Sequence, residues 1–517
     1  MTFEIVFVLL SLLGMVIALI MDKMRPGMVL FSVVVLFLCA GILSPKEMLE
    51  GFSNKGMITV ALLFLVSEGI RQSGTLGQVI KKLLPQGKTT VFKAQLRILP
   101  SVAFISAFLN NTPVVVIFAP IIKHWAKSVN LPATKFLIPL SYVTILGGIC
   151  TLIGTSTNLV VHGMILEAGF EGFSMFELGK VGIFIAIAGI IYIFLFSKRL
   201  LPDARPDTAV PDEEVEEGEK LHRVEAVLGA RFPGINKKLK DFNFQRHYGA
   251  EVKEIKTRNG QRFVSNLEDV VLHEGDTLVV MADDTFIPTW GESSVFVLLT
   301  NGNEPDTTGK KKRWFALLLL VLMIVGATVG ELPVTKEMFP DIKLDMFFFV
   351  SITTIIMAWT NLFPARKYTK YISWDILITI ACAFAISKAM VNSGVADSVA
   401  KFIIGLSDDY GPHVLLAMLF IITNLFTELI TNNAAAALAF PLALSIASQL
   451  GVSPTPFFVV ICMAASASFS TPIGYQTNLI VQGIGNYKFT DFVRIGLPLN
   501  IITFLISIIL IPLIWNF

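Results

Sequence analysis

The chain has 517 residues, of which 54% are hydrophobic and only 15% charged, and its mean hydropathy is +0.70. Soluble domains carry about 25% charged residues, so this composition excludes a soluble globular protein and indicates a chain whose solvent is lipid. The formal net charge of +2 is too small to indicate a nucleic-acid polymer as a partner.

Ten segments are apolar and long enough to cross a bilayer, which takes about 20 residues in a helix. The first of them lacks the basic start and the cleavage site of a signal peptide, so we interpret it as a membrane span. Two of the ten are long and interrupted by polar and glycine residues, and we expect broken helices there. The predicted spans are 3–21, 27–44, 56–72, 134–169, 178–197, 314–332, 345–363, 374–392, 455–484 and 492–515.

Two further apolar stretches, about 96–125 and about 412–450, each carry a polar cluster at the centre. The clusters are Asn110-Asn111-Thr112 and Thr431-Asn432-Asn433. Unsatisfied polar groups in hydrocarbon cost several kcal/mol, so such clusters lie inside protein or in a watery cavity. We therefore predict that each stretch is a re-entrant hairpin that enters and leaves the membrane on the same side.

The distribution of basic residues predicts the sidedness of the chain, because loops on the cytoplasmic side are rich in Lys and Arg. With the hairpins counted as non-crossing, the basic loops fall on one face, while the other face carries acids such as Glu167 and Asp397. We expect a multi-pass protein of the plasma membrane, or of the inner membrane of a bacterium. Both termini then lie outside, the first hairpin enters from the cytoplasm, and the second enters from outside.

The two halves of the chain repeat at an offset of about 320 residues. Residues 153–161 return as 473–481, and Ser73-Gly74 returns as Ser393-Gly394. A half with five spans reverses its direction, so the second half is inverted, and inverted repeats with broken helices are typical of secondary transporters that bind substrate at the repeat interface. The predicted fold class is an α-helical polytopic membrane protein with an inverted repeat of five spans plus a re-entrant hairpin each, and a small α+β cytoplasmic insert. The membrane repeats are 1–199 and 313–517.

Each polar cluster begins a new half-helix, whose first N–H groups lack partners within the helix and favour an anion. An Asn amide donates N–H to an anion while its oxygen faces a cation. Sodium is a hard ion that prefers oxygen ligands, and the breaks around Gly154 and Gly474 offer free carbonyl groups. The alternative is that these are packing motifs, since small and polar residues also hold membrane helices together.

The paired clusters and breaks resemble those of the divalent anion:sodium symporters, solute carrier family thirteen, whose tips carry Ser-Asn-Thr and whose breaks read like Gly-Thr-Pro-Pro-Asn. Here the breaks read Gly154-Thr155-Ser156-Thr157-Asn158 and Gly474-Tyr475-Gln476-Thr477-Asn478. The resemblance implies a sodium-coupled homodimer in membrane lipid that moves its transport domains like an elevator. It implies substrate contacts at Asn111, Thr112, Thr155, Asn432, Asn433 and Tyr475. It implies sodium contacts at Ser106, Asn110, Asn111 and Gly154 for the first ion, and at Thr427, Thr431, Asn432 and Gly474 for the second.

The departures from the family pattern bear on the substrate. Asn110 and Thr431 replace the serines of the signature but keep a side-chain oxygen, and Asn433 replaces a threonine. Tyr475 stands where dicarboxylate binders have a small hydroxyl residue, and its ring should shrink the pocket. We therefore expect a compact divalent oxyanion, sulfate, to be favoured over the alternative, a dicarboxylate such as succinate or citrate.

Residues 200–312 break the apolar pattern and form the predicted insert. An acidic linker, Asp212 to Glu219, precedes strand-like runs around 222–228, 250–256, 261–264 and 277–283, and Asn259-Gly260 is a hairpin turn signal. About 218–290 resembles a TrkA-C (RCK-C) regulatory module. Such modules dimerise, and some bind small nucleotide-type ligands such as cyclic dinucleotides; the alternative is a dimerisation domain without a ligand.

Three other classes of function fit the sequence less well. A sodium/proton antiporter needs an embedded carboxylate pair, for which Glu68 and Glu428 are candidates that do not lie at a tip. A potassium channel needs a ring of four filter loops, whereas the stretch from Thr471 to Tyr475 occurs once. An enzyme is not expected, because the sequence has no HExxH motif and no nucleophile elbow.

Overall fold

The computed structural model describes residues 3–21, 24–203, 222–229, 231–257, 261–283, 286–290, 295–300, 309–339, 342–405 and 411–517. The predicted acidic linker from Asp212 to Glu219 and the predicted turn at Asn259-Gly260 lie outside these residues.

Most of the described residues are helical. The helices of the first half are α1 (Phe3–Met21), α2 (Pro26–Cys39), α3 (Pro45–Glu50), α4 (Lys55–Gln72), α5 (Thr75–Leu83), α6 (Val91–Ser106), α7 (Asn111–Ser128), α8 (Leu137–Gly148), α9 (Ser156–Glu167) and α10 (Gly179–Leu200). Those of the second half are α13 (Lys310–Gly330), α14 (Pro333–Met338), α15 (Met346–Trp359), α16 (Trp374–Asn392), α17 (Val395–Gly405), α18 (Gly411–Leu429), α19 (Asn432–Leu450), α20 (Thr455–Ser466), α21 (Gln476–Gly485) and α22 (Phe489–Ile514).

The outer helices present apolar side chains where a soluble protein would present polar ones. Leu10 on α1 is 63% exposed and Leu513 on α22 is 74% exposed, and large exposed apolar surfaces of this kind mark contact with lipid. Within the described residues, eight helices are long and apolar enough to cross a membrane. The predicted fold class of a polytopic helical membrane protein with a small α+β insert is confirmed.

The two halves are intertwined rather than placed side by side. Helix α2 packs on α16 and its counterpart α15 packs on α4; likewise α7 packs on α21 and α19 packs on α9. Each of these contacts joins the first half to the second. A hairpin helix of one half therefore lies against the broken span of the other half, as the sequence repeat requires for a shared site.

The helix interruptions coincide with the polar clusters. Helix α6 ends at Ser106 and α7 begins at Asn111, while α18 ends at Leu429 and α19 begins at Asn432. The two broken spans are interrupted between α8 and α9 and between α20 and α21. Gly154 lies in the first break, where an added Cβ atom would come within 2.5 Å of the Gly148 carbonyl oxygen. Close approach of backbone to backbone therefore requires glycine there.

The insert contains one antiparallel sheet with the strand order β3-β2-β4-β1-β5. Its strands are β1 (His222–Leu228), β2 (Glu251–Lys256), β3 (Arg262–Phe263), β4 (Thr277–Ala282) and β5 (Phe296–Thr300), and its short helices are α11 (Phe244–Tyr248) and α12 (Phe286–Trp290). Buried aromatic and aliphatic side chains, among them Phe232, Tyr248 and Leu278, give it a core of its own. Strand β5 was not among the predicted strands, because its continuous apolar run lacks the alternation of a half-buried strand.

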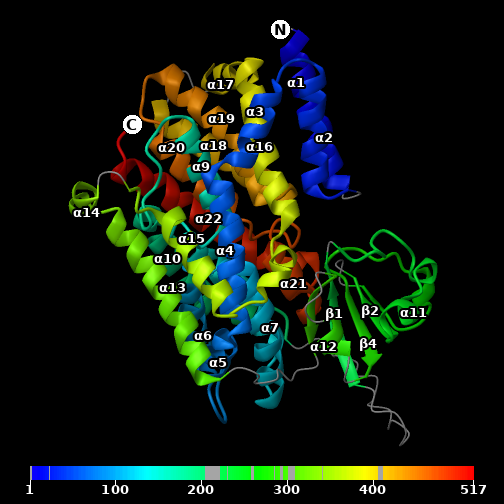
Figure 1. Cartoon of the computed structure of the whole chain (residues 1–517). Coiled ribbons are helices and arrows are strands. Elements are labelled where there is room, and N and C mark those ends of the chain that lie inside the picture. Colours follow the sequence, from blue (N-terminus) through cyan, green and yellow to red (C-terminus); the bar gives the residue numbers. More distant parts are fainter. Residues whose placement is uncertain are drawn as a thin grey trace, which may run out of the picture.

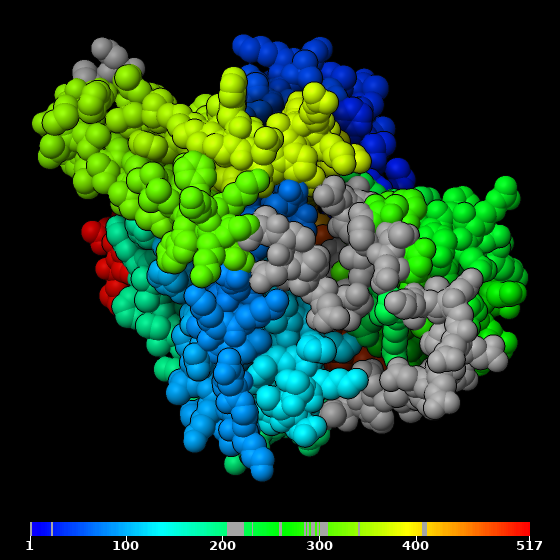
Figure 2. Space-filling view, turned by 60° about the horizontal axis from the view of Figure 1, so that its bottom comes forward, coloured from blue at the N-terminus to red at the C-terminus, as the bar shows by residue number. Residues whose placement is uncertain are grey.

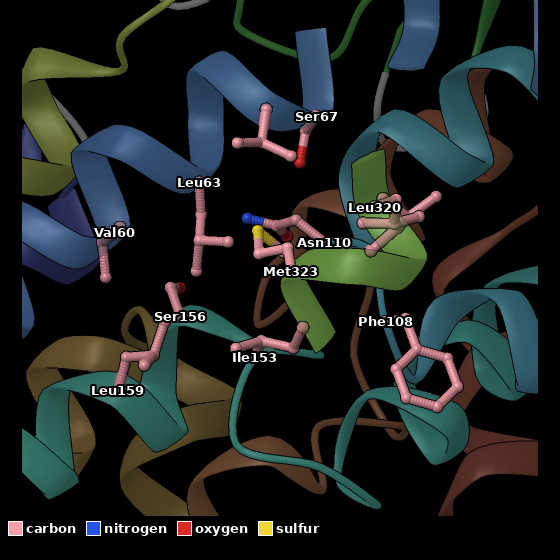
Figure 3. A pocket seen from close by; sticks show the side chains of 12 residues that line it. Val60, Leu63, Ser67, Phe108, Asn110, Ile153, Ser156, Leu159, Leu320 and Met323 are labelled. Carbon is pink, nitrogen blue, oxygen red and sulfur yellow. The ribbon is translucent and has the colours of Figure 1, made fainter. Parts of the chain in front are cut away.

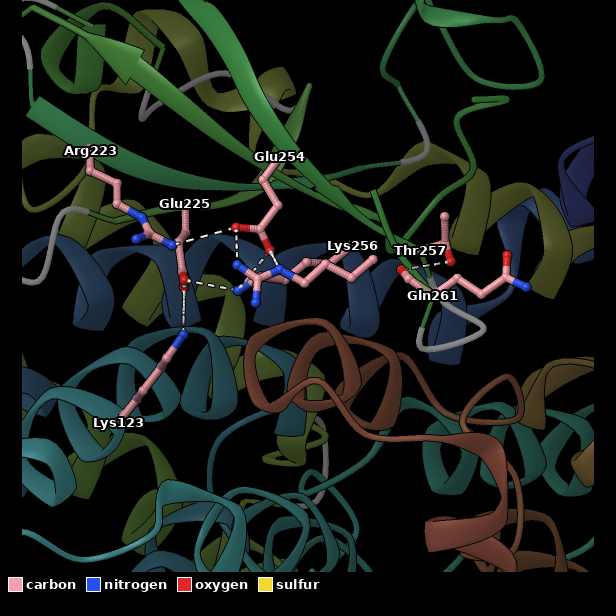
Figure 4. A network of polar contacts seen from close by, with 8 residues as sticks. Lys123, Arg223, Glu225, Glu254, Lys256, Thr257 and Gln261 are labelled. Atoms are coloured by element: carbon pink, nitrogen blue, oxygen red, sulfur yellow. Dashed lines mark hydrogen bonds and ion pairs between the residues drawn. The ribbon is translucent and has the colours of Figure 1, made fainter. Parts of the chain in front are cut away.

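The insert lies beside α7 and α21 (Figure 1) and forms a separate lobe at one side of the helical body (Figure 2). Lys123 on α7 donates to both carboxylate oxygens of Glu225 on β1 at 2.9 Å. Glu225 is also 3.5 Å from the buried ammonium group of Lys256, within the polar network drawn in Figure 4. Both chain termini lie toward the opposite end of the helical body from the insert (Figure 1). Which end faces the cytoplasm remains a prediction from the charge distribution.

Candidate functional site

Four helices begin at one place, where the two halves meet. They are α7 and α19 at the hairpin tips and α9 and α21 after the breaks, and their first residues are Asn111, Asn432, Ser156 and Gln476. Each helix start presents backbone N–H groups without partners in its own helix and the positive end of the helix dipole. Since the side chains at these four positions are neutral, the attraction that these helix starts offer to an anion would come from dipoles rather than from a fixed cation.

The hydroxyl group of Tyr475 lies at the centre of this meeting point. The Asn111 amide is 2.6 Å from it and the Thr155 hydroxyl is 3.1 Å from it, and both contacts join the first half to the second. Asn432 also interacts with the same hydroxyl. Tyr475 is only 9% exposed, so its ring fills space that a smaller side chain would leave open. The structure thus brings four of the six predicted substrate residues together.

The other two predicted substrate residues, Thr112 and Asn433, lie next to this centre and also reach across to the opposite half. Thr112 donates its hydroxyl to Gln476 Oε1 at 3.2 Å. Asn433 Oδ1 accepts from Thr157 at 3.2 Å and from Ser156 at 3.4 Å. Each hairpin tip is therefore tied by side chains to the start of the opposite broken helix.

A cluster of oxygens surrounds the Asn111 amide on the side away from Tyr475. Asn111 Oδ1 accepts from Ser106 Oγ at 2.7 Å, and the same amide atom lies 2.8 Å from the Thr144 carbonyl oxygen and 3.3 Å from that of Gly154. With the amide turned over, Nδ2 would donate to these oxygens and Oδ1 would face the Tyr475 hydroxyl. With Oδ1 inward, four neutral oxygens converge, which is the donor set that a hard cation such as sodium prefers.

The second half holds a matching cluster around Thr427. Its hydroxyl lies 2.9 Å from Asn432 Oδ1 and 2.6 Å from the Ala465 carbonyl oxygen. One hydroxyl hydrogen serves only one of these two acceptors, so oxygens are in excess. The Thr431 hydroxyl is buried and has no hydrogen-bond partner in the part of the chain that the structure describes. These residues fit a sodium ion, whereas the described residues hold no group of three or more His, Cys, Asp or Glu side chains for a transition metal.

Asn110 is the predicted sodium residue that the structure places apart. Its side chain points into a small cavity between α4, α13 and the first break, together with Ser67 and Ser156 (Figure 3). The cavity has a volume of about 10 Å³, roughly the room that one water molecule needs. It is too small for an anion, and a sodium contact from the Asn110 side chain has no support in this geometry.

Several residues that shape the site were not among the predicted contacts. Asn158 donates to the Thr151 carbonyl at 2.9 Å, and the equivalent Asn478 donates to the Thr471 carbonyl at 3.1 Å. The hydroxyls of Thr151 and Thr471 accept from the backbone N–H of Gly154 and Gly474 at 3.1 and 3.2 Å. These bonds hold both breaks in the same shape. The signal was available, since Thr151, Asn158 and their counterparts recur in the sequence repeat.

The two carboxylates considered for an antiporter are held by different partners. Glu68 forms an ion pair with Arg71, with contacts of 2.7 and 2.6 Å. Glu428 Oε1 accepts at 2.8 Å from the Ser470 backbone N–H and at 2.8 Å from the Asn500 amide. Glu428 therefore ties the second hairpin to the second break, and the two carboxylates do not form a pair.

Comparisons with known proteins agree with this architecture. A family model described as "Citrate transporter" (CitMHS) matches residues 16–451 and 342–516. An uncharacterized transporter of Synechocystis sp. is 30% identical over 94% of this chain and 93% of its own length. A probable sodium/sulfate cotransporter 3 of Chlamydomonas reinhardtii is 23% identical over 89% of this chain and 82% of its own length. The crystal structure of the Alcanivorax borkumensis YdaH transporter shares the fold, with a TM-score of 0.52 at 12% identity over 90% of this chain and 86% of that one.

Proposed function

The chain belongs to the CitMHS citrate transporter family, and on that premise we propose that it is a sodium-coupled symporter of a divalent oxyanion, with sulfate as the preferred substrate. The observation that carries the proposal is the meeting of four helix starts from both halves around uncharged Asn, Thr and Tyr side chains. Relatives named as sodium/sulfate cotransporters support the choice of ion and substrate.

The substrate-facing groups are proposed to be those around the Tyr475 hydroxyl, namely Asn111, Thr112, Thr155, Asn432, Asn433 and Tyr475 itself. Hydroxyl and amide donors with free backbone N–H groups bind oxyanion oxygens without neutralising them. Because Tyr475 is buried at the centre, the space favours a compact tetrahedral anion. We expect the ring to prevent a four-carbon chain from lying across the two tips.

The two oxygen clusters are proposed as the sodium sites. Ser106, Asn111 and Gly154 contribute to the first, with the Thr144 carbonyl as a further oxygen. Thr427, Thr431, Asn432 and Gly474 belong to the second. Asn111 and Asn432 each take part in both an oxygen cluster and the anion site. Sodium bound to an amide oxygen would fix the amide so that its N–H groups face the anion, which couples the two binding events.

Transport is proposed to follow an elevator-type alternating access in a homodimer within the lipid bilayer. We assign the hairpins, the broken spans, α10 and α22 to the moving unit and the helices α2, α4, α13, α15 and α16 to the fixed one. The two units meet where α16 packs on α19 and α4 packs on α9. We further propose that the insert is cytoplasmic, that both termini lie outside, and that a small nucleotide-type ligand on the insert regulates transport.

Uptake of labelled sulfate into proteoliposomes tests the proposal. We expect uptake that requires an inward sodium gradient, that stops when sodium is replaced by potassium, and that excess thiosulfate or molybdate reduces. Uptake of sulfate without dependence on sodium, or no uptake of sulfate at all, contradicts the proposal.

A second candidate function is sodium-coupled transport of a dicarboxylate or citrate. The description of the matched family favours it. The same vesicles separate the two, since succinate or citrate uptake without sulfate uptake would establish this second function in place of the first.

A further inference from the structure

Ser156 and Gln476 occupy equivalent positions in the two halves, and neither was among the predicted substrate residues. Each is the first residue of the helix that follows a break, α9 and α21 respectively. Each also contacts the third residue of the opposite polar cluster, because Ser156 reaches Asn433 and Gln476 reaches Thr112. Both side chains therefore lie next to residues that we propose as substrate contacts, and Ser156 also lines the small cavity beside Asn110.

The two contacts differ in how accessible they are. On one side, Asn433 is 8% exposed and is held by the buried Thr157 as well as by Ser156. On the other side, Gln476 is exposed and Thr112 is half-buried. The site is thus closed at the Asn433 edge and reachable at the Thr112 edge, where a long amide side chain stands in place of a short hydroxyl.

We propose that Gln476 is a specificity-determining residue that donates an amide N–H to the anion at the reachable edge of the site. This inference rests on the proposed anion transport. Gln476 Oε1 already accepts from Thr112, and a glutamine amide keeps two N–H donors on its nitrogen. The Thr112 bond holds the amide oxygen and leaves both N–H donors of the nitrogen available to an anion. Ser156 acts only as a positioning residue, because Thr157 also holds Asn433.

Three substitutions test this role in proteoliposomes with an inward sodium gradient. Gln476→Met keeps the length of the side chain and removes the amide, and we expect the KM for sulfate to rise about tenfold, since bonds to charged groups are among the stronger ones. Gln476→Glu places a negative charge beside the anion, and we expect a larger rise. Ser156→Ala should change the KM less than about threefold, since the Thr157 bond to Asn433 remains.

The sodium dependence separates this role from a general structural one. Gln476 is not part of either oxygen cluster, so the sodium concentration for half-maximal uptake should stay within about twofold in all three variants, a difference below about half a kcal/mol. The matched control is Gln261→Glu, the same change at an exposed position on the insert, and it should leave both constants unchanged. Thermal unfolding of the purified variants checks that each is folded.

The outcomes separate the role of Gln476 from the proposed transport function on which it rests. If wild-type vesicles show no sodium-driven anion uptake, the proposed function fails before any variant is compared. If wild-type vesicles transport sulfate and both Gln476 variants keep the wild-type KM, only the role of Gln476 is overturned. A rise in KM that is matched by an equal rise in the sodium requirement also overturns it, because the substitution would then have disturbed the whole site.

Discussion

At the scale of single residues, the site consists of neutral side chains whose orientation depends on the groups around them. Asn111 is the clearest case, since one of its amide atoms faces the Tyr475 hydroxyl and the other faces the oxygens of Ser106, Thr144 and Gly154. A bound sodium ion and a bound anion would each require the same orientation of this amide. Cooperation between the two ligands can therefore arise from one side chain.

Tyr475 should set the size of the substrate. In Tyr475→Thr the ring is removed and a hydroxyl is kept, which restores the small residue of dicarboxylate binders. We expect succinate uptake to appear and the KM for sulfate to rise about tenfold, a loss of about 1.4 kcal/mol of binding. The measurement is uptake of both labelled anions by the same vesicles. Unchanged selectivity would show that the ring does not limit the pocket.

Thr427 should affect the binding of sodium more than the binding of the anion. Thr427→Val removes the hydroxyl beside Asn432 Oδ1 and the Ala465 carbonyl. We expect the half-saturating sodium concentration to rise about tenfold, because a lost oxygen ligand weakens a hard-ion site, while the KM for sulfate at saturating sodium changes little. The matched control is Thr423→Val, one turn earlier on α18, whose buried hydroxyl has no partner among the described residues. Equal effects of the two substitutions would contradict the assignment.

At the scale of helices and strands, the sheet of the insert contacts two helices, α7 and α21, whose first residues lie at the site. Helix α7 carries Asn111 at one end and Lys123 farther along, where it meets Glu225 on β1. Helix α21 begins at Gln476, and its Gly483 lies against Thr277 on β4. Since α7 and α21 also pack on each other, the sheet contacts two packed helices whose first residues lie at the anion site.

The Lys123–Glu225 ion pair should stabilise this docking. Lys123→Met removes one partner of the Glu225 carboxylate, whose side chain is 15% exposed. We expect the free energy that docks the insert on α7 to fall by about 2 kcal/mol, the scale of a hydrogen bond to a charged group. Hydrogen exchange at β1 measures the loss. Lys127→Met is the control, because it changes an exposed lysine on the same helix. Equal exchange in the two variants would show that the ion pair contributes nothing to docking.

The pH dependence of the same contact follows from the pKa of Glu225. Burial raises this pKa, but Lys123 and Lys256 lower it more, so it falls from an ordinary 4.5 to about 2. A pKa that is lower in the folded state gives stability that is present above the unfolded value and lost as the pH falls toward the folded one. We therefore expect hydrogen exchange protection of β1, normalised for the intrinsic exchange rate, to stay level from pH 8 to about 5. It should then decline as the pH is lowered below about 4. A decline above about pH 6 would identify a different titrating group.

At the scale of the whole molecule, the inverted repeat preserves charge pairs as well as helices. Lys55 on α4 forms an ion pair with Asp345 beside α15. At the equivalent positions of the other half, Asp375 on α16 accepts from the Gly27 N–H at 3.2 Å and lies near Arg25. The signs are exchanged between the halves. An inverted repeat places equivalent positions on opposite faces of the membrane, so the two contacts are predicted to lie on opposite faces, with Arg25 and Asp375 on the cytoplasmic one.

Much of this architecture could be predicted from the sequence, because a polar cluster in an apolar stretch is rare and its recurrence in both halves points to a shared site. The helix starts at Asn111 and Asn432 follow from that pattern. The contact between Thr112 and Gln476 does not, because it joins residues 364 positions apart and no local pattern states which helices pack together. Strand β5 and the docking of the sheet on α7 and α21 depend on tertiary packing for the same reason.

The insert should travel with the anion site, because its described contacts with α7 and α21 lie within the unit that contains the hairpins. A disulfide between Gly483→Cys and Thr277→Cys tests this. A Cβ atom on residue 483 would lie 3.8 Å from that of Thr277, which matches the usual disulfide separation of about 3.8 Å. We expect the oxidised double variant to transport at a rate within about twofold of the reduced one, a barrier change below half a kcal/mol.

The two single-cysteine variants serve as controls for the loss of Gly483 and of Thr277. If oxidation stops sulfate uptake in the double variant alone and reduction restores it, the sheet has to leave α7 and α21 during each cycle. The insert would then act as a clamp that is released for transport. If uptake continues with the disulfide closed, the sheet and the two helices move as one body. A ligand on the insert could then change transport only through the contacts of that body with the remaining helices.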